Sequence, residues 1–339
     1  MLRREYGLEA GEAAIGRSPA GRVNETYFVD FGRKCVLQKL NGFLAALPGL
    51  GENLNRVRQA MIGTEVNCPA VIPAKNGDWH HVDPKDGSVW RLLDFLPGRP
   101  PEKNSLDDAF VSAKALGKCH EALNSPRPID LTPTHMDNGE FSNQKLCQAR
   151  DFEVISQFYR GHPRLSSLDA ELKRGVQAAN WLPNRPAFQK VFLARDLVIH
   201  LDCKRDNFLL DPFAGPSLID WDTVGYGDPL LDVGEMCRSW AVAEEKPFFE
   251  AKMAAALIQG YREGGFRLEK ERFQLLPTVV RAMALNLARR YLTDALAEVY
   301  FQWDREAYPS LYEQNKARAR HLLDLTEELL DREAELSRI

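Results

Sequence analysis

Four polar residues stand close together in the segment 198–222, in the pattern H-x-D-x-K-x-x-N: His200, Asp202, Lys204 and Asn207. An apolar run follows them, and a second apolar run ends eighteen residues after Asp202, at Asp220. The two runs predict a β-hairpin, which would bring two carboxylates and an amide to one edge. These groups suit phosphoryl transfer, because that reaction depends on positioning and charge neutralisation more than on covalent chemistry.

Each of these residues has a place in such a reaction. Asp202 would orient or deprotonate the acceptor hydroxyl, and Lys204 would stabilise the phosphoryl group during transfer. Asn207 and Asp220 supply oxygen atoms of the kind that Mg²⁺ prefers, in combination with phosphate oxygens. His200 is expected to hold the geometry of the loop. The sequence therefore predicts a kinase that uses ATP and Mg²⁺.

The same acidic residues allow two other interpretations. A two-metal phosphodiesterase could be built from His200, Asp202, Asp220, Asp222 and Asp228. Such a site usually includes several histidines, and the other six lie in unrelated segments. A nucleotide-binding regulator without turnover is the second alternative. All three essential polar positions, Asp202, Asn207 and Asp220, are present, which weighs against a chain that has lost its activity.

The elements before this segment predict a β-rich lobe that would hold the nucleotide. A hairpin is expected over residues 21–40, a short helix over 53–63, and a second hairpin with an Asn-Gly turn over 71–82. A further strand over 88–96 ends at a Pro- and Gly-rich break, where we place the domain boundary. The predicted domains are an ATP-binding lobe, residues 1–96, and a catalytic and acceptor-binding lobe, residues 97–339.

The second lobe has helical periodicity over most of its length. Helices are expected over 107–123, 143–160, 167–181, 231–242, 247–263, 270–300 and 309–337. The predicted fold class is α+β, with a small antiparallel β-rich lobe and a larger helical lobe, in the manner of a two-lobed kinase. The cleft between the lobes would bind the nucleotide.

Two neighbouring residues at the end of the first hairpin compete for one role. Lys39 or Gln38 would point at the α- and β-phosphates. The positive charge favours Lys39, but strand alternation alone does not decide which of the two faces inward. Glu52 or Glu65 could pair with that lysine.

Composition excludes several classes of protein. A net charge of −4 gives no reason to expect nucleic acid as a partner. No run approaches 18 consecutive apolar residues, and the first twenty residues lack an apolar core, so neither a membrane span nor a signal peptide is expected. The six cysteines are scattered without a C-x-x-C pair, which indicates reduced thiols and a cytoplasmic protein. Oligomeric state is not predicted.

The segments HLDCKRDN and IDWD resemble the catalytic loop and the metal-binding segment of the aminoglycoside phosphotransferase/choline kinase superfamily. These are small-molecule kinases with the protein-kinase-like fold. The run at 227–233 is similar to the helix start that follows in this superfamily, and the resemblance implies that Asp232 braces the catalytic loop. The segment between Asp220 and that helix is too short for the activation segment of a protein kinase, so peptide substrates are not expected.

A narrower resemblance covers nearly the full length and points to the N-acetylhexosamine 1-kinases. It rests on NETY at 24–27, QKLN at 38–41, Trp90, Arg91 and Phe95, DTV at 222–224, RYLTD at 290–294, and Tyr300 with Phe301. Cys203, Asp206 and the residues 225–227 depart from the pattern of these kinases. Because these positions flank the acceptor side, the identity of the sugar stays open.

The resemblance assigns roles to eight residues. It implies nucleotide binding by Asn24, Thr26, Lys39, Asp94 and Phe95, and acceptor binding by Arg91, Arg290 and Asp294. The residue spacing alone would make Arg290 and Asp294 an i,i+4 surface pair. The expected reaction is transfer from ATP to a hydroxyl of a small molecule, in the first place the anomeric hydroxyl of an N-acetylhexosamine. Aminoglycosides, choline and homoserine are the alternative acceptors.

Overall fold

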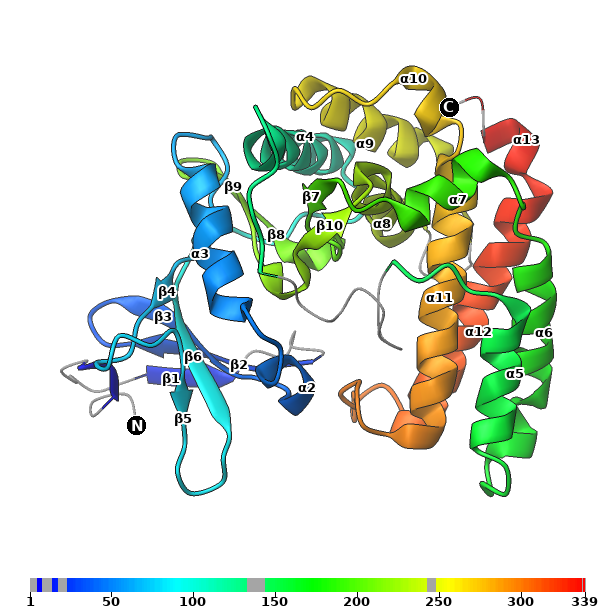
Figure 1. The fold of residues 1–339 in the computed structure, drawn as a ribbon, viewed down its shortest axis with the longest axis horizontal. Helices are drawn as coiled ribbons and strands as arrows, with labels where there is room; N and C mark the ends of the chain where they lie inside the picture. Colours follow the sequence, from blue (N-terminus) through cyan, green and yellow to red (C-terminus); the bar gives the residue numbers. More distant parts are fainter. Residues whose placement is uncertain are drawn as a thin grey trace.

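The computed structural model describes residues 5–7, 14–17, 23–132, 144–242, 248–336 and 338. They form a small β-rich lobe, blue to cyan in Figure 1, and a larger lobe made mostly of helices. The predicted fold class, with a small antiparallel sheet and a larger helical part, is confirmed. The domain boundary between residues 96 and 97 stays a prediction.

The sheet of the small lobe is antiparallel. Its strands lie in the order β1 (Ala14–Arg17), β2 (Glu25–Asp30), β3 (Lys34–Lys39), β6 (Val89–Asp94) and β4 (Val71–Ile72), and β5 (His81–Val82) also pairs with β6. The predicted hairpin of β2 and β3 is confirmed. Its turn uses Gly32, which has a φ of 77° and donates its N–H to Asp30 Oδ1 at 3.0 Å. Residues 21 and 22, where the hairpin was expected to begin, lie outside the described part.

The second predicted hairpin, over residues 71–82, is wrong in its pairing. The expected turn is present, because the Gly77 N–H donates to the Ala74 carbonyl at 2.8 Å. However, β4 and β5 each pair with β6 rather than with each other. The reason is the length of β6, which pairs with β3 on one side and has room for both short strands on the other.

The catalytic segment lies in the larger lobe, on the side of it that faces α3 (Figure 1). It consists of β7 (Leu197–Ile199), the short helix η3 (Arg205–Asn207), β8 (Phe208–Asp211), β9 (Gly215–Leu218), η4 (Trp221–Thr223) and β10 (Gly225–Gly227). The predicted hairpin is confirmed as β8 and β9, with Phe208 opposite Leu218. Asn67 of the small lobe donates from Nδ2 to the Ala214 carbonyl at 2.8 Å, which ties the hairpin to that lobe.

The described helices largely follow the predicted periodicity. They are α2 (Gly42–Ala45), α3 (Leu50–Met61), α4 (Leu106–Asn124), α5 (Ala149–Phe158), η2 (Leu165–Leu168), α6 (Asp169–Asn180), α7 (Pro186–Leu193), α8 (Pro229–Trp240), α9 (Ala251–Glu263), α10 (Lys270–Phe273), α11 (Leu276–Ala297), α12 (Leu311–Asp331) and α13 (Glu333–Leu336). Helix α7 was not predicted. The helix expected over 270–300 is divided, and Pro277 stands in the first turn of its second part, where proline is tolerated.

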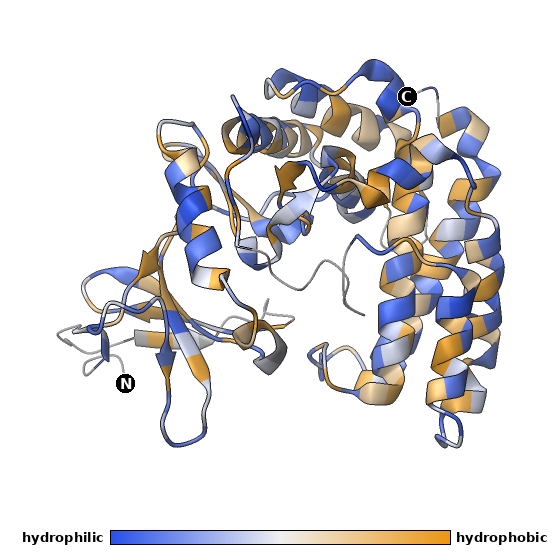
Figure 2. Cartoon of the chain, viewed as in Figure 1, coloured by the Kyte–Doolittle hydropathy of each residue, from blue (hydrophilic) through white to orange (hydrophobic). Residues whose placement is uncertain are grey.

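Helices α5, α6, α11 and α12 run side by side in the larger lobe (Figure 1). Hydrophobic and hydrophilic colours alternate along α6 and α12 in Figure 2, as expected for amphipathic helices that bury one face. A second close contact joins α4 to α9. A Cβ atom at Gly260 would lie 2.2 Å from the Phe110 carbonyl oxygen, and one at Gly117 would lie 2.4 Å from that of Tyr261. The two helices therefore meet backbone to backbone.

None of the helices in the described ranges combines the length and the apolar character needed to cross a membrane.

Candidate active site

Asp232 of α8 holds the catalytic loop from below. Its carboxylate accepts the N–H groups of His200 and Leu201, both at 2.7 Å. Leu201 has a φ of 67°, a left-handed conformation that is unusual for leucine, and the second bond stabilises it. His120 of α4 contacts the same carboxylate at 2.9 Å. Burial opposes ionisation of Asp232, but these contacts outweigh it and lower its pKa. The predicted brace is confirmed.

His200 is buried beneath the loop. Its Nδ1 accepts the Asp202 N–H at 3.2 Å, so Nε2 carries the proton and donates to the Ile219 carbonyl at 3.0 Å. Burial lowers the pKa of His200, which keeps the ring neutral near pH 7. His200 thus links the loop to the residue before Asp220, which is the supporting role predicted for it.

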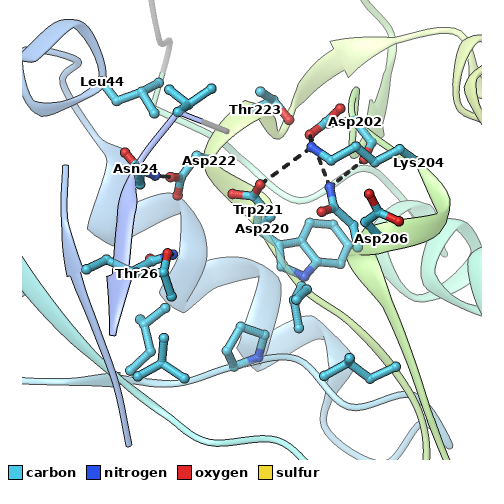
Figure 3. A pocket seen from close by; sticks show the side chains of 18 of the residues that line it. Asn24, Thr26, Leu44, Asp202, Lys204, Asp206, Asp220, Trp221, Asp222 and Thr223 are labelled. Atoms are coloured by element: carbon cyan, nitrogen blue, oxygen red, sulfur yellow. Dashed lines mark hydrogen bonds and ion pairs between the residues drawn. The ribbon is translucent and has the colours of Figure 1, made fainter. Parts of the chain in front are cut away.

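Asp202 and Lys204 lie side by side in the loop (Figure 3), and Asn207 contacts Asp202 there. The Lys204 ammonium donates to Asp202 Oδ2, and the Asn207 Nδ2 donates to the same oxygen at 3.1 Å. Burial works against ionisation of Asp202, but the Lys204 and Asn207 contacts prevail and lower its pKa. Asp202 is therefore an anion near pH 7. Its Oδ1 has no hydrogen-bond donor among the described residues, so it is available to a ligand hydroxyl.

Asp220 has φ 64° and ψ 55°, the left-handed region, directly after the β8–β9 hairpin. Its Oδ2 lies 3.9 Å from Lys204 Nζ. Burial raises the pKa of Asp220 to about 6, with Asp222 and Asp202 acting in the same direction. Asp220 and Asn207 face one cavity. Two protein oxygens completed by phosphate oxygens and water fit Mg²⁺, which rarely uses an all-protein cage.

A row of polar residues faces the same cavity from the sheet. Thr26, Gln38 and Arg91 are direct neighbours on β2, β3 and β6. Gln38 Nε2 donates to Thr26 Oγ1 at 3.3 Å, and Arg91 Nε donates to Gln38 Oε1 at 2.9 Å. Asn24, before β2, donates from Nδ2 to Asp222 Oδ2 at 3.2 Å.

The preference for Lys39 over Gln38 is not supported by the geometry. Lys39 alternates to the other side of β3, where its ammonium lies 3.7 Å from Asp86 and over the Trp90 ring. Neither Glu52 nor Glu65 accompanies it, since Glu52 accepts from the Thr132 hydroxyl and Glu65 pairs with Lys118. The period of two in a strand, with Thr26 as neighbour, places Gln38 on the cavity side.

Arg91 makes an ion pair with Asp222 that sequence reasoning missed. Its Nη1 and Nη2 donate to the two oxygens of Asp222 at 2.5 and 2.8 Å. Arg91 is 2% exposed and Asp222 4%, so this bidentate pair is buried between the lobes. Arg91 therefore lies with the predicted nucleotide residues Asn24 and Thr26, not with Arg290. A separation of 131 residues left no local signal for the pairing.

Asp94 and Phe95 lie where β6 leaves the sheet. The Asp94 carboxylate accepts the Ala70 N–H and lies 3.9 Å from Arg58 Nη1. The Phe95 ring packs edge-to-face against Phe28, with centroids 6.1 Å apart. Phe95 and Phe28 both line the cavity, which gives this end an aromatic wall suited to a nucleobase.

Arg290 of α11 lines the same cavity, at the end opposite Phe95. Its Nη2 donates to the Tyr300 hydroxyl at 3.1 Å, and its guanidinium lies over the rings of Tyr300 and Phe301, 5.2 and 5.8 Å from their centroids. On α8, Glu235 and Arg238 form an i,i+3 ion pair that also lines the cavity. Sequence reasoning missed this pair, because its spacing is equally typical of an exposed helix surface.

Asp294 has a structural position instead of the predicted acceptor role. It is fully buried, and its two oxygens accept the N–H groups of Val299, Tyr300 and Phe301 at 2.8–3.0 Å. Asn315 Nδ2 donates to the same carboxylate at 3.0 Å. Asp294 therefore fastens the loop between α11 and α12, and with four donors on its carboxylate it does not face the cavity.

Most of these residues line one cavity of about 660 Å³ between the lobes. Of the predicted site residues it is lined by Asn24, Thr26, Arg91, Asp94, Phe95, Asp202, Lys204, Asn207, Asp220 and Arg290, and not by Lys39 or Asp294. Figure 3 shows Asn24, Thr26 and Asp222 on one side, and Asp202, Lys204 and Asp206 on the other. The volume suits a nucleotide with a small second ligand.

The phosphodiesterase interpretation lacks support in this geometry. Asp222 is paired with Arg91, and Asp228 caps α8 while pairing with Arg272. Among the residues that the structure describes, no group of three or more His, Cys, Asp or Glu could hold a metal ion. Asp222 and Asp228 therefore have structural partners in this arrangement.

Residues 16–267 match the phosphotransferase enzyme family. A protein of Mus musculus named acyl-CoA dehydrogenase family member 10 is 24% identical over 250 residues, which are 72% of this chain and 21% of the mouse protein. The chain thus spans about a fifth of the length of this curated relative.

Solved structures with similar folds include three kinases. A microcompartment-associated aminopropanol kinase aligns with a TM-score of 0.60 and 19% identity, over 96% of this chain and 95% of its own. The amicoumacin kinase hAmiN, in complex with AMP-PNP, Ca²⁺ and Ami, aligns with a TM-score of 0.62 and 13% identity, over 98% of this chain and 91% of its own. The choline kinase of Cryptosporidium parvum aligns with a TM-score of 0.56 and 12% identity, over 94% of this chain and 90% of its own. At these identities the likeness concerns the fold.

Proposed function

The chain belongs to the phosphotransferase enzyme family, and on that premise we propose that it transfers the γ-phosphoryl group of ATP to a hydroxyl of a small, uncharged, sugar-like acceptor. The nucleotide would lie against the sheet, between Asn24, Thr26 and the aromatic wall at Phe95. The acceptor would lie between the catalytic loop and α11. One observation supports an uncharged acceptor. At the acceptor end of the cavity, every described acidic side chain is paired with a cation.

Asp202 is the base in this proposal. Its ionised carboxylate has an oxygen available to the acceptor hydroxyl, and Lys204 holds the carboxylate in orientation. Lys204 also lies near Asp220. Its positive charge is therefore close to the place where the phosphoryl group would pass, between Asp202 and the proposed metal ligands. Mg²⁺, held by Asn207 and Asp220, would supply charge neutralisation on the phosphates. The brace through Asp232 and His200 fixes the loop before ligands arrive, so little reorganisation is needed during the reaction.

The charges around the acceptor end disfavour a polycation. Asp202 is bonded to Lys204, Asp206 lies 3.4 Å from the Arg205 guanidinium, and Glu235 is paired with Arg238. Arg290 adds a further positive charge. A polycationic aminoglycoside requires an acidic pocket with unneutralised carboxylates, and the described lining does not present one.

The aromatic residues at this end also disfavour choline. A quaternary ammonium group is bound through the faces of aromatic rings. Here the Arg290 guanidinium already covers Tyr300 and Phe301. A neutral sugar needs hydrogen-bond partners and one flat apolar surface, and the arginines with Tyr291, Tyr300 and Phe301 supply both. An N-acetylhexosamine phosphorylated at its anomeric hydroxyl remains our first candidate.

An acceptor panel tests this proposal. ADP release would be measured with ATP and Mg²⁺ for N-acetylhexosamines, other hexoses, amino alcohols, homoserine, choline and aminoglycosides, with the Asp202→Asn variant as control. We expect turnover with a neutral sugar and its loss in the variant, and NMR of the product would identify the phosphorylated oxygen. Preferred turnover of an amino alcohol, choline or an aminoglycoside would refute the acceptor class.

The cellular setting is also part of the proposal. All six cysteines are buried thiols, scattered along the sequence. We place the enzyme in the cytoplasm, where ATP and Mg²⁺ are available, and this location stays a prediction.

A further inference from the structure

A kinase of this shape needs positive charge from its β-lobe beside the nucleotide phosphates, and the sheet shows which residue provides it. Four cations line the cavity among the described residues: Arg91, Lys204, Arg238 and Arg290. Lys204, Arg238 and Arg290 belong to the helical lobe. Arg91 stands on β6, in one row with Gln38 and Thr26, whereas Lys39 is on the opposite side of the sheet.

The Arg91 guanidinium is held at Nε, Nη1 and Nη2 and still leaves donors for a ligand. It has five N–H donors. Three are used, one by Gln38 Oε1 and two by the carboxylate of Asp222, and the remaining two have no acceptor among the described residues. A planar guanidinium can bind a carboxylate through one edge and still donate a remaining N–H to a phosphate, which an ammonium group cannot do with fixed geometry.

Asp222 is itself fixed in position. Asn24 donates to its Oδ2, and the Asn41 N–H donates to Asn24 Oδ1 at 2.9 Å. Asp222 follows Asp220 by two residues, so the carboxylate that orients Arg91 and the proposed metal ligand belong to one short turn, η4 and the residue before it. The position of the Arg91 cation relative to the proposed metal ligand is therefore set by this short turn and its hydrogen bonds.

We propose that Arg91, oriented by Asp222, is the residue of the β-lobe that binds the nucleotide phosphates, in place of Lys39. This inference rests on the proposed use of ATP, and it gives Arg91 a nucleotide role where the sequence resemblance implied an acceptor role. Asp222 acts through Arg91 and is a positioning residue. A buried Arg–Asp pair that served only to join the lobes would not need to face the cavity or leave two donors unused.

Nucleotide binding tests the assignment without any acceptor. Calorimetry at saturating Mg²⁺ would compare ATP, AMP and adenosine on the wild type, Arg91→Lys, the double variant Arg91→Met/Asp222→Asn, and Lys39→Met. The double variant avoids an unpaired buried carboxylate, and thermal unfolding checks that it is folded. Lys39→Met is the matched control, because it removes a cation of the same lobe that lies outside the cavity.

The expected pattern is specific to the phosphates. Loss of a charge-assisted contact should weaken ATP binding by about 10- to 100-fold in the double variant, with adenosine changed less than about twofold. The ATP affinity of Arg91→Lys should lie between those of the wild type and the double variant. Lys39→Met should bind ATP like the wild type. If the Arg91 variants bind ATP as tightly as the wild type, or lose adenosine and ATP equally, the inference is wrong. If the wild type itself binds no ATP, the proposed function fails first.

Discussion

Replacing Asp294 by alanine tests whether a single buried carboxylate holds the loop between α11 and α12. Four donors converge on it, three of them backbone N–H groups of consecutive residues, Val299, Tyr300 and Phe301. The fourth is the amide of Asn315 on α12. The same loop carries two rings that line the cavity, so its position should affect both stability and acceptor binding.

The size of the effect follows from these contacts. Hydrogen bonds to a charged group contribute about 1.5–3 kcal/mol each, and water can reach part of the loop once the carboxylate is gone, since Val299 is 70% exposed. We therefore expect Asp294→Ala to lower the free energy of unfolding by about 3–5 kcal/mol, a large part of the 5–15 kcal/mol typical of a domain. Asp294→Asn should cost about half as much, because its remaining oxygen keeps two of the four bonds.

Denaturant unfolding followed by circular dichroism measures the change, with Glu306→Gln as control. Glu306 is an exposed acid of the same loop, and its substitution should stay within about 0.5 kcal/mol of the wild type. The KM for the acceptor should also rise more than the KM for ATP in Asp294→Asn. A loss below about 1 kcal/mol for Asp294→Ala would show that the loop is held by other contacts and would refute this reasoning.

Three further predictions concern the site and its support. In Asp202→Asn, kcat should fall by about 10²- to 10⁴-fold while ATP binding measured by calorimetry changes little; equal turnover would disprove the base assignment. Because burial raises the pKa of Asp220 to about 6 and a metal ligand must be ionised, the affinity for Mg²⁺–ATP should fall about tenfold from pH 8 to pH 5. Asp220→Asn should lose this dependence, and an unchanged pH profile in that variant would assign it to another group. Gly260→Ala should cost about 2–4 kcal/mol in denaturant unfolding, because the new methyl group would overlap the Phe110 carbonyl; Gly63→Ala, at a glycine with open space around it but a φ of 84°, measures backbone strain alone.

The catalytic loop could be predicted from the sequence because its information is local. The spacing from His200 to Asn207 and the two apolar runs before Asp220 define one loop and one hairpin, and both are present. The brace by Asp232 was implied by the resemblance and is confirmed, although its third contact, from His120, was not foreseen.

The remainder depended on contacts that no local pattern records. Which of Gln38 and Lys39 faces the cavity depends on the register with Thr26 and Arg91. The partner of Arg91 lies in the other lobe. Asp294 has the spacing of a surface pair with Arg290, but its carboxylate is saturated by a loop that follows the helix, which the helical period does not reveal.

The backbone contact between α4 and α9 limits how this protein can change during evolution. Gly117 and Gly260 each leave no room for a side chain, and His120 and Tyr261, which are bonded to each other at 2.8 Å, stand one turn or less from them. His120 in turn contacts the carboxylate that fixes the catalytic loop. A substitution that separates the two helices would therefore disturb the catalytic loop and lower turnover, although the substituted residue touches no ligand. Selection for turnover would therefore also act on the packing of α4 against α9, although neither helix belongs to the catalytic segment.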